Sequence, residues 1–199
     1  MRPRWYGDNR DLVKWSVLVH LAKMNTAKRI LQIAYFRDDD FSGVEIDGEK
    51  FDIPSEIGAH FRDIRRTEGL SSPLKVSILD RVFKNRKEYL DQAKEFITSF
   101  SHERCIVFLD PDTGLEPARP NLNHVLNCEI KELWDTMKQG DILVLYQHKT
   151  NKKGGPWVKW AEPKRLQFER AIAAATGSVK IAHGFRLTGD VVLLYVPKA

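Results

Sequence analysis

Residues 104–116 read R-C-I-V-F-L-D-P-D-T-G-L-E, and this stretch decides the fold. Residues 105–109 form an unbroken apolar run bounded by turn-forming residues, a pattern typical of a strand buried on both faces. Pro111 has no N–H to donate, so we expect the strand to end there. Asp110 and Asp112 therefore follow the carboxyl end of a central strand, where open α/β sheets bind ligands. The alternative is a turn that only ends the strand.

The rest of the chain alternates between helix and strand patterns. Apolar residues at helical spacing predict helices over 9–24, 86–100, 125–138 and 162–176, with a shorter one that starts at Ser55 and ends before Gly69. Other apolar patterns predict strands over 29–36, 74–79 and 141–148, a hairpin around Asp47-Gly48, and a C-terminal strand pair over 178–184 and 189–196. This alternation indicates a three-layer α/β domain whose mainly parallel sheet is flanked by helices and ends in an antiparallel strand pair.

Length and composition fit one globular domain. The 199 residues include 42% hydrophobic and 30% charged residues, which are ordinary values. We expect a single domain over 1–199 that begins with an arm and a helix over 1–28. No apolar run approaches the roughly 20 residues that span a bilayer, and no secretory signal is visible, so we expect a cytoplasmic protein without membrane contact. Cys105 and Cys128 are expected to be buried thiols rather than a disulfide.

Acidic residues follow the first predicted strand. Asp38, Asp39 and Asp40 stand where a nucleotide-binding sheet would carry a glycine-rich loop. We interpret them first as a solvated loop, second as a metal site, and third as contacts to the hydroxyl groups of a ligand.

The strand predicted over 141–148 also ends on polar residues, Gln147 and His148. If it lies beside the strand over 105–109, the side chains of Asp110, Asp112, Gln147 and His148 should face one crevice. His148 is then a candidate base, ligand or hydrogen-bond donor. The alternative is a histidine that only satisfies the end of its strand.

A basic segment over 149–161 follows the same strand. It combines four lysines with two tryptophans: Lys149, Lys152, Lys153, Trp157, Lys159 and Trp160. Lysines suit phosphates and tryptophans suit unstacked bases, so we expect this loop to bind nucleic acid, in line with the formal charge of +5. The alternatives are a solvated loop, or tryptophans that pack in the core beneath it. The sequence does not indicate the oligomeric state.

Two motifs resemble a known family. G-D-N-R-D-L-V-K-W at 7–15 is similar to the G-N-H-A-D-V-L-K-H signature of the RlmJ-type 23S rRNA adenine-N6 methyltransferases, and F-L-D-P-D at 108–112 stands in the place of their I-D-P-P-Y motif. The resemblance implies a class I methyltransferase-like fold. It also implies that Lys14 contacts S-adenosylmethionine and that Asp110 accepts a hydrogen bond from the amino group of the target adenine.

The pattern of this family is not complete. The glycine-rich loop is missing, and Asp112-Thr113 replace the Pro-Tyr pair whose aromatic ring would stack on a flipped adenine. The chain also resembles a group of small bacterial and phage proteins of unknown activity. They share the elements G-D-x-x-D-x-x-K, D-P-D-x-G-L-E and Y-Q-H, all of which occur here.

The leading hypothesis is a divergent S-adenosylmethionine-dependent methyltransferase that acts on nucleic acid. The expected catalytic residues are Asp110, Asp112 and His148, and the expected cofactor contacts are Asp8, Lys14 and Asp38. An alternative is a nuclease or phosphoesterase that binds Mg²⁺ or Mn²⁺, since these ions prefer oxygen ligands such as Asp110, Asp112 and Glu116, with Asp8 or His148 as further candidates. A third hypothesis is a nucleic-acid-binding module without catalytic activity.

Overall fold

The computed structural model describes residues 8–37, 43–52, 54, 64–69, 74–149, 157–184 and 187–199. Six strands form the main sheet in the order β4-β1-β5-β8-β10-β9. Their bounds are β1 Arg29–Ile33, β4 Lys75–Ile78, β5 Cys105–Leu109, β8 Ile142–His148, β9 Lys180–Ala182 and β10 Val191–Pro197. Strands β4, β1, β5 and β8 are parallel, whereas β10 runs antiparallel to both β8 and β9. The predicted mainly parallel sheet and its C-terminal antiparallel pair are confirmed, so the fold is α/β as expected.

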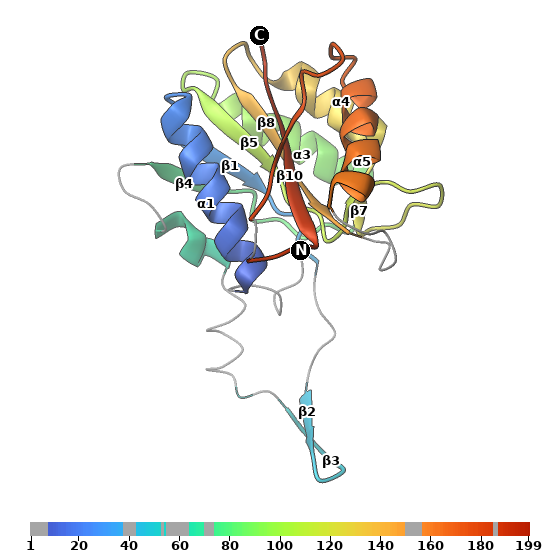
Figure 1. Cartoon of the computed structure of the whole chain (residues 1–199). Helices are drawn as coiled ribbons and strands as arrows, with labels where there is room; N and C mark the ends of the chain where they lie inside the picture. The colour runs from blue at the N-terminus through green and yellow to red at the C-terminus, as the bar shows by residue number, and fades with distance from the viewer. Residues whose placement is uncertain are drawn as a thin grey trace.

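Helices cover both faces of this sheet (Figure 1). Helix α1 packs on one face, and α3, α4 and α5 pack on the other. Their bounds are α1 Asn9–Met24, α3 Arg86–Ser99, α4 Asn127–Thr136 and α5 Trp157–Ala171. The side chain of Asp8 caps α1 by accepting hydrogen bonds from two backbone N–H groups of its first turn. The result is the expected three-layer arrangement.

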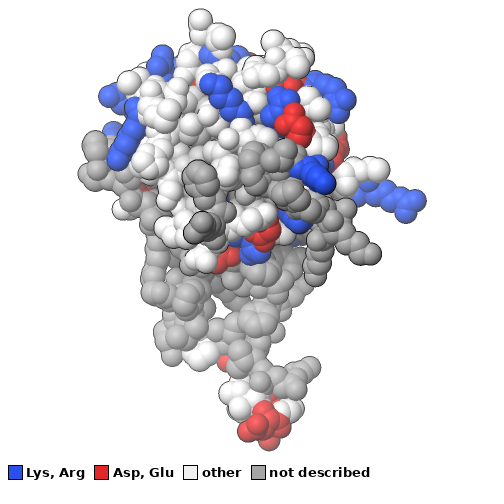
Figure 2. Space-filling model, viewed as in Figure 1, with Lys and Arg blue, Asp and Glu red and all other residues white. Residues whose placement is uncertain are grey.

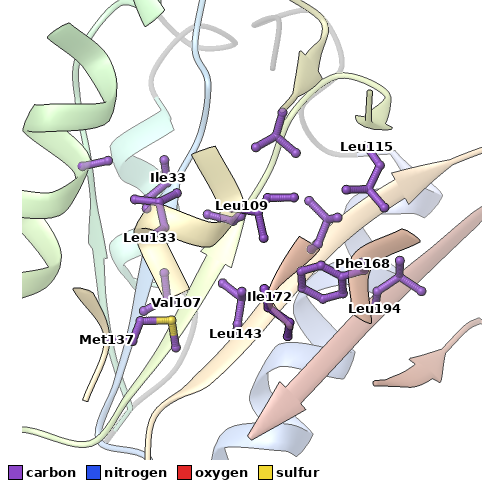
Figure 3. Packing of buried hydrophobic residues seen from close by; sticks show 14 of the residues in the cluster. Ile33, Val107, Leu109, Leu115, Leu133, Met137, Leu143, Phe168, Ile172 and Leu194 are labelled. Carbon is purple, nitrogen blue, oxygen red and sulfur yellow. The ribbon is translucent and has the colours of Figure 1, made fainter. Parts of the chain in front are cut away.

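Strand β5 contributes to two hydrophobic cores because successive side chains point to opposite faces. Val107 and Leu109 pack with residues of α3, α4 and α5, including Phe168, in the core that Figure 3 shows. Phe108 faces α1, where its ring meets that of Trp15 edge-on, with 6.2 Å between the ring centroids. Every residue of β5 is buried, so the predicted central strand is confirmed.

Several elements differ from the predictions. Strand β1 is shorter than expected and ends before Tyr35, whose positive φ of 46° is incompatible with a strand. The loop after β5 contains two short parallel strands that were not predicted, β6 Gly114–Leu115 and β7 His124–Val125. Helix α5 begins at Trp157, inside the segment predicted as a loop, because Trp160 and Ala161 pack on the core instead of facing solvent.

Two further predictions have mixed outcomes. Both cysteines are free thiols, but only Cys105 is buried, whereas Cys128 is exposed on α4. Most of the helix predicted from Ser55 lies outside the described residues, and its described end, Ile64–Gly69, is a 3₁₀ helix. Among the described residues, no helix is long and apolar enough to cross a membrane.

A hairpin projects away from the sheet (Figure 1). Its strands are β2 Gly43–Ile46 and β3 Glu49–Asp52, which pair antiparallel around the predicted turn at Asp47-Gly48. Figure 2 shows acidic side chains gathered at its tip, while the lysines and arginines of this view lie scattered over the body. Ile46 and Phe51 are exposed on the hairpin. The predicted hairpin is therefore confirmed, as an arm with an acidic end.

Gly114 is expected to be essential for the loop after β5. It has a φ of +111°, and a Cβ added there would lie 2.5 Å from Cδ of Gln147. We predict that Gly114→Ala lowers the free energy of unfolding by roughly 2–4 kcal/mol, through backbone strain and overpacking. Gly177→Ala is the matched control, since Gly177 has a φ of +84° but no atom within 4 Å of the added Cβ. Urea denaturation measures both, and equal losses would contradict the clash with Gln147.

Candidate functional site

The sheet grows in opposite directions from β1 and β5, since β4 continues it beyond β1 and β8 continues it beyond β5. Ligands of open α/β sheets bind at such a switch point, outside the carboxyl ends of the strands. Two polar side chains mark this point, Gln32 near the end of β1 and Asp110 directly after β5. Both are buried, at 1% exposure each.

Lys14 of α1 forms a buried ion pair with Asp110. Its Nζ lies 3.1 Å from the Asp110 carboxylate and 2.7 Å from Oδ1 of Asp11. Nε2 of Gln32 donates a second hydrogen bond to Oδ2 of Asp110, at 2.9 Å. All four residues, Asp11, Lys14, Gln32 and Asp110, are buried, with at most 6% of their surface exposed. The structure therefore joins the two motifs that carry the family resemblance in one polar cluster.

Burial and pairing act in opposite directions on these charges. Burial raises the pKa of Asp110, and the charge of Lys14 opposes this without bringing the pKa back to its ordinary value. Burial alone would lower the pKa of Lys14, but the carboxylates of Asp110 and Asp11 raise it above the usual range. Lys14 therefore remains a cation between two acids, because nearby opposite charges stabilise its protonated form.

Two neighbours hold Lys14 in place. The cap that Asp8 forms fixes the first turn of α1, where Asp11 lies, one turn before Lys14. The ring of Tyr146 in β8 lies 4.9 Å from Nζ of Lys14, a cation–π contact. Burial raises the pKa of Tyr146, so its hydroxyl stays protonated beside the cluster. Asp8 thus acts as a cap, and its expected contact with the cofactor stays a prediction.

Gln32 carries the feature of this cluster that points most directly to a ligand. Its Oε1 is buried and has no hydrogen-bond partner among the described residues. An unpaired buried acceptor costs about 1–3 kcal/mol, so its retention needs an explanation. A ligand N–H or O–H group is a partner that would satisfy it.

A second polar network lies on the same face of the sheet. Arg10 of α1 donates to Asp190, which precedes β10, and Thr188 donates to the same carboxylate at 2.8 Å. Nε2 of His148 lies 3.3 Å from Oδ2 of Asp190. Burial opposes ionisation of Asp190, but the hydrogen bonds from Arg10 and Thr188 lower its pKa to about 2. His148 is therefore held by a permanent anion.

The single crevice expected from the sequence is not formed. Asp110 and His148 lie on the α1 side of the sheet, but Gln147 turns to the other side, where it binds Leu115 and Thr113. Asp112 forms an ion pair with Arg37 instead of joining Asp110. Successive side chains along β8 point to opposite faces of the sheet, which separates Gln147 from His148, and the chain turns at Pro111, which separates Asp112 from Asp110. The prediction took neither effect into account.

The alternative metal site is not assembled either. Glu116 uses its carboxylate to accept the backbone N–H of Asn127 at the start of α4, and Asp112 is paired with Arg37. In the described part of the chain, no three His, Cys, Asp or Glu side chains are placed to hold a metal ion. Asp38, which was a candidate cofactor contact, lies outside the described residues with Asp39 and Asp40.

The basic segment is only partly described. Lys152 and Lys153 lie outside the described residues, and Trp157 is described only as the first residue of α5. Lys149 follows β8 and its backbone N–H binds the carbonyl of Asp190, while Lys159 is exposed on α5. Trp160 packs against the larger core. Of the two alternatives for this tryptophan, the structure supports packing.

Several residues of the site were missed by the sequence analysis. Gln32 is a polar residue inside an apolar run, which is a detectable signal for a buried polar contact. Asp80 is a further candidate rather than an observed member of the site: it is an acid two residues after β4, the neighbour of β1, and nucleotide-binding α/β folds use an acid in this region to bind ribose hydroxyls. No local sequence pattern identified the other three residues, Tyr146, Arg10 and Asp190, because their roles arise from contacts between segments that are distant in the sequence.

Comparisons with known proteins give no identity. The sequence matches no family model, and no curated protein matches it. Among solved structures, the chain is similar to a DUF574 family protein from Streptomyces avermitilis, with 8% sequence identity and a TM-score of 0.45. That similarity covers 96% of this chain and 82% of the other.

The Lys14–Asp110 pair is expected to dominate the stability of the site. Lys14→Met leaves a buried carboxylate without its cation and should lower the free energy of unfolding by about 3–5 kcal/mol. Adding Asp110→Asn should restore part of this loss, because the uncompensated charge is then removed. Urea denaturation of the two single variants and the double variant tests this.

The control for this cycle is Lys94→Met, which removes a lysine from an exposed pair with Asp91 and Glu132. Its denaturation midpoint should hardly change. Strictly additive effects of Lys14→Met and Asp110→Asn would show that the two side chains do not interact.

Proposed function

We propose that the chain is an S-adenosylmethionine-dependent, methyltransferase-like enzyme that acts on nucleic acid. The observation that carries this proposal is the buried contact of Lys14 with Asp110 at the switch point of the sheet. The two residues come from the two motifs that resemble the methyltransferase signatures, and their roles require them to be close. The methyltransferase-like fold agrees with this assignment.

The residues at the switch point fit the cofactor in the chemistry of their donors and acceptors. Two of the three N–H groups of Lys14 suffice for its two carboxylate contacts, which leaves one for the carboxylate of an amino acid. Oε1 of Gln32 is an unpaired acceptor suited to an ammonium group. Lys14 and Gln32 would therefore hold the amino-acid end of the cofactor, and Asp80 is the candidate for its ribose.

The loop after β1 departs from the usual cradle. Tyr35, rather than a glycine, takes the positive φ there, and its backbone N–H is bound by the hydroxyl of Tyr89. In the described part of this loop, residues 34–37, side chains would therefore replace backbone N–H groups in binding the cofactor. When bound, S-adenosylmethionine supplies an activated methyl group.

Asp110 is the residue that would orient the target. Its carboxylate is fixed by Gln32 and neutralised by Lys14, so it accepts a hydrogen bond from an amino group without carrying an uncompensated charge. Such a contact positions the nitrogen and withdraws its N–H proton from solvent. The amino group of an unstacked base is the chemical group that this acceptor suits.

The proposed contacts to the polynucleotide lie in the basic segment after β8. Lys149, Lys152, Lys153 and Lys159 would bind phosphates, and Trp157 would stack on a base. Trp160 is assigned to packing, because it lies against the core. If the chain only binds nucleic acid and has no catalytic activity, these contacts remain, but Gln32 does not bind a cofactor.

Calorimetric titration with S-adenosylmethionine tests the cofactor assignment. Binding is expected for the wild type, and Gln32→Leu should weaken it by roughly 10- to 150-fold, since a hydrogen bond to a charged group contributes about 1.5–3 kcal/mol. Gln92→Leu on the exposed face of α3 is the control and should bind as the wild type does. Absence of heat with folded protein at millimolar ligand would remove the cofactor from the proposal.

The salt dependence of nucleic-acid binding tests the basic segment. One variant replaces its four lysines with glutamine: Lys149, Lys152, Lys153 and Lys159. The control replaces four exposed lysines: Lys28, Lys75 and Lys180 at the amino ends of strands, and Lys23 in the last turn of α1. The first variant should flatten the slope of log affinity against log salt by roughly 3–4 units if all four lysines touch phosphate, because each phosphate contact contributes about 0.7–0.9. Equal slopes for the two variants would exclude the segment from the interface.

A further inference from the structure

A cavity of about 590 Å³ lies on the face of the sheet opposite the Lys14–Asp110 cluster. It is formed by the loop after β6, the start of α4 and one side of α5. The residues that line it are Glu116, Pro117, Ala118, Asn127, Lys164, Gln167, Arg170 and Ala171. Its volume falls within the range of small-molecule sites, which is about 300–1,000 Å³.

Lys164 places a positive charge on this cavity without a counterion. Its Nζ donates to the backbone carbonyls of Leu115 and Glu116, at 3.2 Å and 3.1 Å, and to the side chain of Gln167. Among the described residues, no carboxylate lies within ion-pair distance of it. Burial lowers the pKa of Lys164, and the more distant charge of Glu116 only partly opposes this. These three acceptors use all three N–H groups of Lys164, so this half-buried cation offers the cavity a fixed positive charge rather than a free donor.

Arg170 provides a second cation, one turn and a half along the same helix. Its side chain is exposed and has no ion pair in the described part of the chain. Gln167 lies between the two cations and binds the carbonyl of Glu116 and Oδ1 of Asn127, which fixes this wall of the cavity. The single carboxylate of the lining, that of Glu116, already caps Asn127, so the cavity carries a surplus of positive charge.

We propose that this cavity binds the phosphate group of a nucleotide-sized ligand, with Arg170 as its hydrogen-bonding contact and Lys164 as a fixed charge beside it. The planar guanidinium of Arg170 suits two phosphate oxygens at once, and Lys164 adds a fixed charge. Pro117, Ala118 and Ala171 give the apolar wall that a base or sugar requires. The phosphate belongs either to a free nucleotide or to a nucleotide of the polynucleotide chain, and both present the same chemistry to the two cations.

The test titrates the full chain with inorganic phosphate, adenosine monophosphate, adenosine and a short single-stranded oligonucleotide, followed by calorimetry. Adenosine monophosphate should bind and adenosine should not. Arg170→Gln should weaken that binding by roughly tenfold, as expected for a charge-assisted contact to phosphate. Lys75→Gln, an exposed lysine of β4 far from the cavity in the sheet order, is the control and should bind as the wild type does.

Tighter, Arg170-dependent binding of the oligonucleotide assigns the site to nucleic acid, and equal affinity for the mononucleotide assigns it to a free nucleotide. Absence of phosphate-dependent binding, or identical affinities of the wild type and Arg170→Gln, overturns the proposal. Lys164→Met is a second variant, judged only if its melting temperature stays near that of the wild type, because Lys164 also satisfies two carbonyls. S-adenosylmethionine binding by Arg170→Gln should be unchanged, so a failure of this site is distinguishable from a failure of the proposed enzyme.

Discussion

The ion pair between Lys14 and Asp110 is the constraint on which the rest of the structure depends. A cation and two carboxylates, almost completely removed from water, are tolerable only if each has its partners in place. This fixes the rotation of α1 about its axis and its position along the sheet. It also requires that β1 and β5 be neighbours, because Gln32 completes the set. A hydrophobic face alone would hold α1 against the sheet, but it would not choose the register.

The alternation of side chains along the central strands separates the molecule into two functional faces. Even-numbered residues of β5 and β8 face α1 and lead to the cluster at the switch point. Odd-numbered residues face α3, α4 and α5, and the loop that follows β5 on that side forms the wall of the phosphate cavity. One strand end thus supplies both sites, although neither site shares a side chain with the other.

Much of the fold could be predicted from the sequence, because buried strands and amphipathic helices leave local signals. The unbroken run before Asp110 identified the central strand, and the pattern after Gly7 identified α1. The site was harder to predict. Residue order placed Asp110, Asp112, Gln147 and His148 at one edge, but side-chain direction separated them, and that direction depends on strand register and turns. Trp160 was predicted to lie in a loop for a similar reason. Only tertiary packing distinguishes a tryptophan in the first turn of a lysine-rich helix from one in a solvated loop.

The acidic hairpin gives the molecule an electric dipole. Residues 43–52 contain four acids and one lysine, a net charge of −3, so the remainder of the chain carries +8. Because the hairpin projects from the body, these charges are well separated (Figure 1). A polyanion attracts the positively charged body of the protein and repels its negatively charged hairpin. The protein therefore experiences a torque as well as an attraction as it approaches the polyanion. Encounters are thereby biased toward orientations in which the arm points away from the negative surface, before any specific contact forms.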